Sequence, residues 1–390
     1  MTNPMQFWRS LFRNLLIFGL GATVAILVHA CQTEPSSTPP SPASAVTVEP
    51  VPQVATPAKI APAPLPKVTQ AIVNRHKNLV NPPRGEIRLA VISDLNSAYG
   101  STDYDPEVKT GINLLPFWQP DLVLCSGDMV AGQSSSLSDP QLQAMWQAFD
   151  QYIAAPLRQF KLPFGFTMGN HDASSALSAS GNFIFDRERK IATQYWQDPE
   201  HNTGLEFIDR QDFPFYYTFK YQDVFFLAWD GSSDLIPEQK LAWVQKSLQS
   251  PEAKAAKLRI LIGHLPLYAI ATGRNRAGEV MSNNEKLRSL LEQNQVHTYI
   301  SGHQHAYYPA YKGKLQLLHT GALGAGPRTY IDSQMSPRKT MTIIDINFNS
   351  PEITTYTTYD MQTLQVIQNE ELPRSITGVT GTVFRRDVKG

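Results

Sequence analysis

Short apolar runs along the chain alternate with stretches in which apolar residues recur every three or four positions. Continuous apolar runs are typical of strands buried on both faces, and the wider spacing is typical of helices with one buried face. The runs predict strands at 87–93, 121–126, 164–168, 215–220, 224–229, 258–262 and 296–300. The spacing predicts helices around 108–115, 142–153, 241–248 and 287–291, the first of them ended by Pro116. Strands alternating with helices predict an α/β fold, with helices layered over sheets.

The first 31 residues have the pattern of a targeting segment. Arg9 and Arg13 precede an apolar run at 15–28, as in a secretory signal. The run is short for a membrane-spanning helix, which needs ~20 apolar residues. It ends in VHAC, an imperfect match to the lipobox of bacterial lipoproteins, in which Cys31 would be acylated. We expect a lipid anchor on Cys31, with an uncleaved signal anchor as the alternative. Both place the protein on the periplasmic or cell-surface side of a membrane, tethered to it.

The next segment, 32–84, has the composition of a linker. It is rich in Pro, Ala, Ser, Thr and Val, which favours extended, semi-stiff chain and cannot bury a core. We expect one folded domain at 85–360, followed by a C-terminal extension at 361–390.

Charge and cysteine content exclude several classes of protein. Lys plus Arg and Asp plus Glu number 34 each, so the chain lacks the basic excess that generic nucleic-acid binding needs. The two cysteines, Cys31 and Cys125, cannot form a disulfide scaffold. Cys125 lies within an apolar strand and is interpreted as a buried thiol without an activating partner.

Polar residues follow five of the predicted strands directly. They are Asp94 and Asn96, Gly127-Asp128, Gly169-Asn170-His171-Asp172, Gly263-His264, and Gly302-His303-Gln304-His305. Ligands of open α/β sheets bind at the carboxyl ends of the strands, so we expect these side chains to meet there. Carboxylate, amide and imidazole groups together suit divalent metals such as Mn, Fe and Zn. A single such residue would indicate nothing, but five clusters in this order indicate a metal site.

This set of motifs resembles that of the calcineurin-like metallophosphoesterase superfamily, whose pattern is D-x-H, G-D, G-N-H-D/E, G-H and G-H-x-H. The resemblance covers roughly 85–356. It implies a four-layer α-β-β-α sandwich of mixed sheets, with two divalent metal ions at the carboxyl edges. A different branch, the purple acid phosphatases, fits less well, because it has a tyrosine where this chain has Ala131.

The resemblance also implies a role for each motif residue. Asp128 would bridge both metals, which would be Mn, Fe or Zn, with Mg as a further candidate. The first metal would also be held by Asp94, Asn96 and His305, and the second by Asn170, His264 and His303. His171 would be the general acid and Asp172 would orient it. A hydroxide formed between the metals would attack a phosphomonoester or phosphodiester, so the expected partner is a small phosphate ester or a nucleotide.

One position departs from the family pattern. Asn96 stands where the family has His, and an amide oxygen binds Zn or Fe less strongly than imidazole does, so the first site would favour Mn or Mg. The alternative is a binding or scaffolding lipoprotein with a vestigial site. The other motif residues are intact, which favours the enzyme. Arg274, Arg276 and Arg328 are either contacts for the substrate phosphate or solvated loop charges.

Overall fold

The computed structural model describes residues 64–389. The expected signal segment, the lipobox-like Cys31 and most of the expected linker lie outside the described residues. Within 64–389 no helix is both long and apolar enough to cross a membrane.

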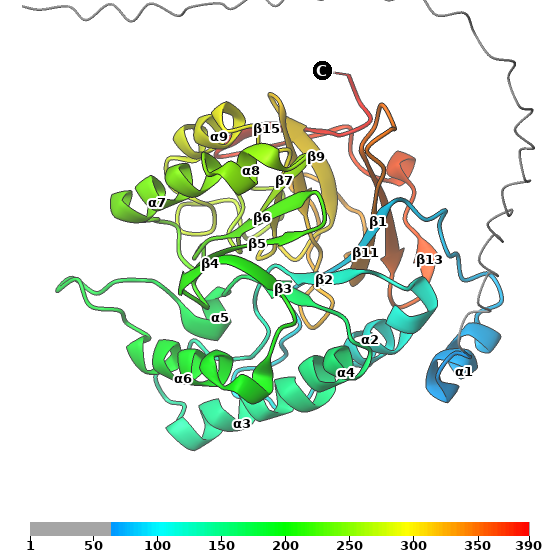
Figure 1. The fold of residues 1–390 in the computed structure, drawn as a ribbon, viewed down its shortest axis with the longest axis horizontal. Helices are drawn as coiled ribbons and strands as arrows, with labels where there is room; N and C mark the ends of the chain where they lie inside the picture. Colours follow the sequence, from blue (N-terminus) through cyan, green and yellow to red (C-terminus); the bar gives the residue numbers. More distant parts are fainter. Residues whose placement is uncertain (1–63, 390) are drawn as a thin grey trace, which may run out of the picture. The chain divides into compact units, whose positions relative to one another are not determined.

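The strands form two sheets of mixed direction, as the resemblance to the family implies (Figure 1). The first sheet has the order β13-β12-β11-β1-β2-β3, with β1 Ile87–Ile92, β2 Leu122–Cys125, β3 Phe164–Phe166, β11 Thr340–Ile346, β12 Thr354–Asp360 and β13 Gln365–Val366. The second has the order β14-β15-β9-β10-β8-β7-β6-β5-β4, with β4 Glu206–Asp212, β5 Tyr216–Tyr221, β6 Val224–Ala228, β7 Leu258–Ile262, β8 Thr298–Ser301, β9 Tyr308–Lys312, β10 Leu315–His319, β14 Ser375–Gly378 and β15 Gly381–Arg385.

The two sheets pack face to face, and the core lies between them. The backbone N–H of Phe166 in β3 donates to the Tyr217 hydroxyl of β5 over 2.8 Å. Beyond the strand ends, the Ser126 and Thr320 hydroxyls lie 2.9 Å apart. Strand β1 is buried along its whole length, because it pairs on both edges and is covered on both faces.

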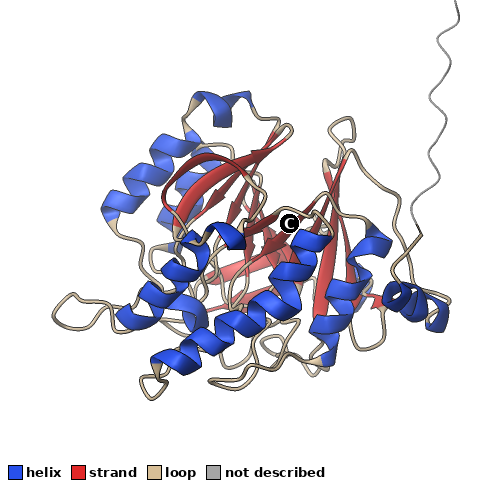
Figure 2. Ribbon diagram, turned by 60° about the horizontal axis from the view of Figure 1, so that its bottom comes forward, coloured by secondary structure: helices blue, strands red, loops and turns tan. Residues whose placement is uncertain are grey.

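Helices cover the outer faces of the sheets (Figure 2). Helix α3 begins at a capping box in which the Gln141 side chain accepts from the Ser138 backbone N–H over 2.9 Å. The helices are α1 Lys67–Arg75, α2 Pro106–Trp118, α3 Asp139–Phe149, α4 Ala155–Gln159, α5 Asn170–Ala173, α6 Asp186–Gln197, α7 Glu238–Leu248, α8 Pro251–Ala255 and α9 Asn284–Gln293, with a π turn at Asp150–Ala154 and 3₁₀ turns at Pro199–His201 and Asn369–Glu371.

Three sequence-based expectations need correction. The expected C-terminal extension, 361–390, contributes strands to both sheets of the domain, because β13 pairs with β12 and β15 pairs with β9. Part of the expected linker belongs to the folded unit, because α1 lies on α2 and the buried Thr69 hydroxyl donates to the Asn113 carbonyl over 2.7 Å. Pro116 does not end its helix, which continues to Trp118. Proline there lacks the N–H that would donate to the carbonyl four residues earlier, so the helix continues with one internal hydrogen bond fewer.

A buried ion pair joins β1 to its antiparallel neighbour β11. Arg88 and Asp345 are cross-strand partners, and Arg88 Nε donates to Asp345 Oδ1 over 2.8 Å and Nη2 to Oδ2 over 3.1 Å. Their side chains are only 2% and 6% exposed. The same guanidinium donates to the carbonyls of Trp118 and Pro82, which fixes the approach of the chain to β1.

Asp345→Asn should destabilise the fold by about 3–5 kcal/mol, because it leaves the Arg88 charge buried without its counter-ion. Chemical denaturation of both proteins measures the difference. Glu206→Gln is the control: Glu206 and Lys220 are also cross-strand partners, but their side chains are 67% and 45% exposed. Glu206→Gln should lower the free energy of unfolding by only about 0–1 kcal/mol. Equal effects of the two substitutions would contradict the importance of the buried pair.

Candidate metal centre

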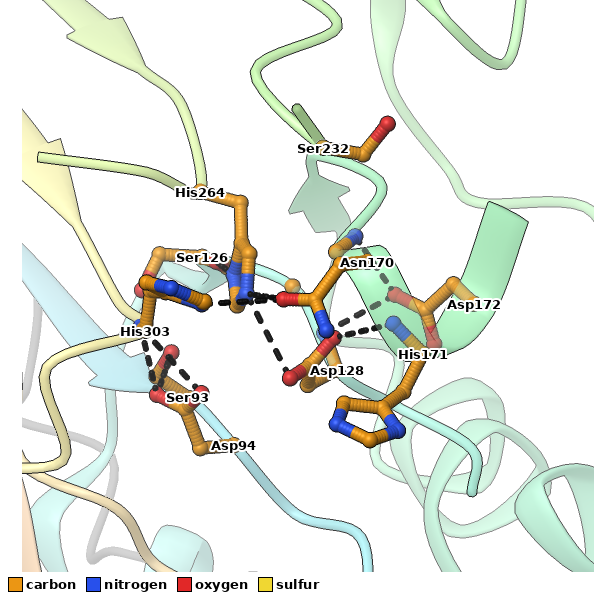
Figure 3. A network of polar contacts seen from close by, with 12 residues as sticks. Ser93, Asp94, Ser126, Asp128, Asn170, His171, Asp172, Ser232, His264 and His303 are labelled. Atoms are coloured by element: carbon orange, nitrogen blue, oxygen red, sulfur yellow. Dashed lines mark hydrogen bonds and ion pairs between the residues drawn. The ribbon is translucent and has the colours of Figure 1, made fainter. Parts of the chain in front are cut away.

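The ends of β1, β2, β3, β7 and β8 bring the predicted polar residues to one place (Figure 3). The candidate ligand residues of the five motifs are all buried: Asp94, Asn96, Asp128, Asn170, His264, His303 and His305. Figure 3 shows Asp128, Asn170 and His264 pointing toward one another from three different strand ends. The polar clusters that follow the apolar runs therefore form a single site.

The backbone at this site is unusual. Asp94, Asp128, His303 and His305 have positive φ angles of 49°, 56°, 65° and 52°. Residues with a side chain seldom adopt this left-handed conformation, and where they do the strain is often functional. Gly302 is required for a different reason, since a Cβ there would lie 2.8 Å from Asp94 Oδ2. The chain turns sharply after each strand and directs these side chains inward.

One group of ligand atoms surrounds the amide oxygen of Asn170. Asn170 Oδ1 lies 3.0 Å from His264 Nε2 and 2.9 Å from His303 Nδ1. The amide is oriented by Gln133, whose Oε1 accepts from Asn170 Nδ2 over 2.6 Å. His264 Nδ1 is engaged by the Ser126 carbonyl at 2.7 Å, which turns Nε2 toward Asn170 and toward Asp128 Oδ2, 3.3 Å away. An amide oxygen, a carboxylate oxygen and two imidazole nitrogens therefore converge, and all four are atoms that can bind a divalent cation.

A second group is centred on Asp94. His305 Nδ1 lies 2.8 Å from the Gly326 carbonyl, which leaves Nε2 as the free nitrogen. That Nε2 lies 3.2 Å from Asp94 Oδ1, yet it is buried and makes no hydrogen bond. Asn96 is buried nearby, and its backbone N–H donates to the Asp128 carbonyl over 3.3 Å. Among residues 64–389 its side chain forms no hydrogen bond.

The electrostatics of the site fit a cation. Carboxylate oxygens of Asp94 and Asp128 and a nitrogen of His264 all lie within 4.8 Å of one another. Burial lowers the pKa of His264, but the charge and hydrogen bond of Asp128 outweigh it and raise the pKa to about 9. Burial would raise the pKa of Asp128, yet the charges of His264 and His171 hold it well below its usual range. The carboxylates thus stabilise positive charge where a metal ion would lie, and the orphaned His305 Nε2 provides a further ligand atom.

His171 lies at the edge of this site, half-buried. Its Nδ1 is 3.0 Å from the Gly132 carbonyl, and its ring centroid is 5.2 Å from that of Tyr99. Its backbone N–H donates to Asp128 Oδ1 over 2.8 Å. The ring is therefore oriented by Gly132 and Tyr99, with Nε2 unconstrained.

The structure corrects the role expected for Asp172. Its carboxylate does not contact the His171 ring; it accepts backbone N–H groups from Asp128, Met129, Val130 and Gly169 over 2.7–2.9 Å. Burial and the charge of Asp128 raise the pKa of Asp172 to about 7. Asp172 therefore joins the ends of β2 and β3 and positions Asp128, instead of forming a dyad with His171.

Three residues of the site were not predicted from the sequence. Glu279 Oε2 lies 2.8 Å from His303 Nε2, and Gln133 orients Asn170. The fully buried Gln304 accepts from the backbone N–H groups of Ile270 and Ala271 over 3.0 Å each. Glu279 and Gln133 lie in loops outside the motifs. Gln304 lies inside the Gly302–His305 motif, and its position between His303 and His305 could have identified it as part of the site.

Comparisons with known proteins agree with this geometry. The family model described as calcineurin-like phosphoesterase matches residues 87–307. No curated protein matches the chain.

Solved structures of similar fold include three of low identity. A purple acid phosphatase from yellow lupin seeds (Lupinus luteus) is 16% identical over 74% of this chain and 54% of its own, with a TM-score of 0.51. GAP50, the anchor in the inner membrane complex of Plasmodium, is 15% identical over 73% and 88% of the two chains (TM-score 0.47). A dimetal phosphatase from Danio rerio is 13% identical over 66% and 95% (TM-score 0.42). This chain spans about half the length of the lupin enzyme, and the likeness is one of fold.

Asp172→Asn should lower both stability and activity, because an amide NH₂ would face backbone N–H donors. Each buried donor left without an acceptor costs about 1–3 kcal/mol. Denaturation and phosphate-release assays measure the two effects, with the 52%-exposed Asp186→Asn as a control. If Asp172 instead formed a dyad with His171, stability would be unchanged and only the pH dependence of kcat would move.

Proposed function

Because the chain belongs to the calcineurin-like phosphoesterase family, we propose that it hydrolyses a phosphate ester at this site with two bound divalent metal ions. The convergence of His264 Nε2 and His303 Nδ1 on the Asn170 amide oxygen carries the proposal. Here each imidazole has its other nitrogen engaged elsewhere, which is how proteins orient ligand histidines.

The proposed ligand sets follow from the two groups of atoms. Asp94, Asn96 and His305 would hold one ion; Asn170, His264 and His303 would hold the other, with Asp128 shared between them. Two divalent ions supply charge stabilisation for the phosphoryl group and lower the pKa of bound water. The donor set of imidazole, carboxylate and amide suits Mn, Fe or Zn, and the amide of Asn96 shifts the first site toward Mn or Mg.

His171 is the proposed general acid, which would protonate the leaving oxygen. The Gly132 carbonyl engages Nδ1, so the proton available for transfer is carried on Nε2. The backbone N–H of His171 also holds Asp128 Oδ1, which couples the position of the acid to that of the shared ligand. A phosphomonoester or phosphodiester would be cleaved with transfer of this proton to the departing alcohol.

We also propose that the protein works outside the cytoplasm, tethered to a membrane. The support comes from the sequence of residues 1–31, in which an apolar run after Arg9 and Arg13 ends at Cys31. The substrate would then be a phosphate ester or nucleotide on that side of the membrane.

Chelation should abolish hydrolysis of a chromogenic phosphate ester, and Mn²⁺ or Zn²⁺ should restore it.

Asp128→Asn should lower kcat/KM by about 100-fold or more, since the carboxylate charge facing His264 is lost. The control Asp223→Asn changes a carboxylate that is 53% exposed in a surface ion pair and should leave the rate unchanged. Full turnover after exhaustive chelation would sink the metal-dependent mechanism.

Mass spectrometry of the mature N-terminus tests the anchor. An acylated chain that begins at Cys31, and its loss in Cys31→Ser, would establish lipid attachment. A chain that begins upstream of Cys31 would instead support the uncleaved signal anchor, and recovery of the protein from the cytoplasm would contradict export.

A further inference from the structure

Two arginines lie beside the candidate metal centre, on loops that run side by side. Arg274 follows β7 and Arg328 follows β10. The loops are joined by a hydrogen bond of 3.0 Å from Thr272 N to the Thr329 carbonyl. Arg274 Nη1 lies 3.1 Å from His303 Nε2, and the backbone N–H of Arg328 donates to the His305 carbonyl over 3.0 Å. Each arginine is therefore adjacent to one histidine of the Gly302–His305 motif.

The positive charge of this pair is only partly compensated. Glu279 Oε2 pairs with Arg274 Nη1 at 2.5 Å, but Arg328 forms no ion pair with any carboxylate of residues 64–389. Both Nε atoms are buried and have no hydrogen-bond acceptor. Burial and the charge of Arg274 lower the pKa of Arg328. Two neighbouring guanidinium groups with free donors form a site to which an anion would bind favourably.

The loop that carries Arg274 is held from two sides. Gln304 accepts from Ile270 N and Ala271 N, and its Nε2 donates to the Glu279 carbonyl over 3.1 Å. The hairpin of β14 and β15 holds the same loop, since Val379 N donates to Asn275 Oδ1 over 2.7 Å. The arginine is positioned before any ligand arrives, which reduces the entropy lost on binding.

Arg274 does not lie on the side of the His303 ring that faces Asn170 and the other candidate metal ligands. The ring presents Nδ1 to Asn170 and Nε2 to Arg274 and Glu279, so the imidazole separates the guanidinium from the atoms that would hold the scissile phosphate. Arg274 remains 16% exposed, so a group reaching past the metal centre can contact it.

We propose that Arg274 and Arg328 bind a second anionic group of the substrate, a phosphoryl or carboxylate group next to the scissile phosphate. The preferred substrates are then phosphate esters or anhydrides with two anionic groups. Nucleoside diphosphates, in which water cleaves the anhydride and releases a nucleoside monophosphate, and phosphorylated hydroxy acids, in which water cleaves the ester and releases the hydroxy acid, are representatives. This inference rests on the proposed phosphoesterase function and names its substrate class.

The test compares kcat/KM for three substrates on the metal-loaded full chain: p-nitrophenyl phosphate, ADP and 2-phosphoglycolate. In Arg274→Gln and Arg328→Gln the ratio of kcat/KM for ADP or 2-phosphoglycolate to that for p-nitrophenyl phosphate should fall about tenfold or more, mainly through KM. Arg328→Lys, which keeps the charge but loses the planar fork, should show an intermediate fall. If the kcat/KM ratio falls for ADP alone, the two arginines bind phosphoryl groups. If it falls for both ADP and 2-phosphoglycolate, they bind either a phosphoryl or a carboxylate group.

The matched control is Arg276→Gln, which changes an arginine of the same loop that also pairs with Glu279 but is 73% exposed. The kcat/KM ratios of Arg276→Gln should equal those of the wild type.

Calorimetric titration with methylenediphosphonate, which is not cleaved, should show weaker binding in Arg274→Gln and Arg328→Gln than in the wild type. If both ratios and this binding are unchanged, the anion site is wrong while the phosphoesterase function stands. If the wild type cleaves none of the three substrates with any metal, both proposals fail together.

Discussion

A single buried carboxylate joins the ends of two neighbouring strands, and the geometry of the whole site depends on it. Asp172 accepts backbone N–H groups from the turn after β2 and from Gly169 after β3. Strand β3 has only three residues, so ladder pairing alone would position its end poorly. Through this carboxylate, Asp128 and Asn170 acquire fixed positions, and the imidazoles from the second sheet then meet them.

The same turns carry the conformational strain of the structure. Four candidate ligands have left-handed backbones, a conformation that costs of order 1–3 kcal/mol for each such residue. The two packed sheets hold these turns in the strained conformation. The ligand side chains are consequently ordered in advance by hydrogen bonds to the carbonyls of Ser126 and Gly326.

Prediction from the sequence succeeded where a strand is a largely continuous apolar run, and it missed the fully buried β11, whose run is interrupted by Thr and Asp. The apolar runs located seven strands, and the polar residues after five of them identified the site. Strands such as β12, Thr354–Asp360, escaped because Thr and Tyr make up most of this half-buried strand, which has no continuous apolar run. The role of Asp172 was misjudged, since its backbone partners come from a turn about 40 residues earlier in the chain. Glu279 was missed for a similar reason: only the fold brings its loop to His303.

The central position of β1 has a consequence for how the protein is made. One edge of β1 pairs with β2, about 30 residues later, but the other pairs with β11, which ends at Ile346. Until that strand has been synthesised, one edge of β1, which is apolar except for Arg88, has unpaired backbone groups, which invites pairing with other chains. This edge therefore waits for its partner over some 250 residues of synthesis, a span fixed by topology and not by the chemistry of the site.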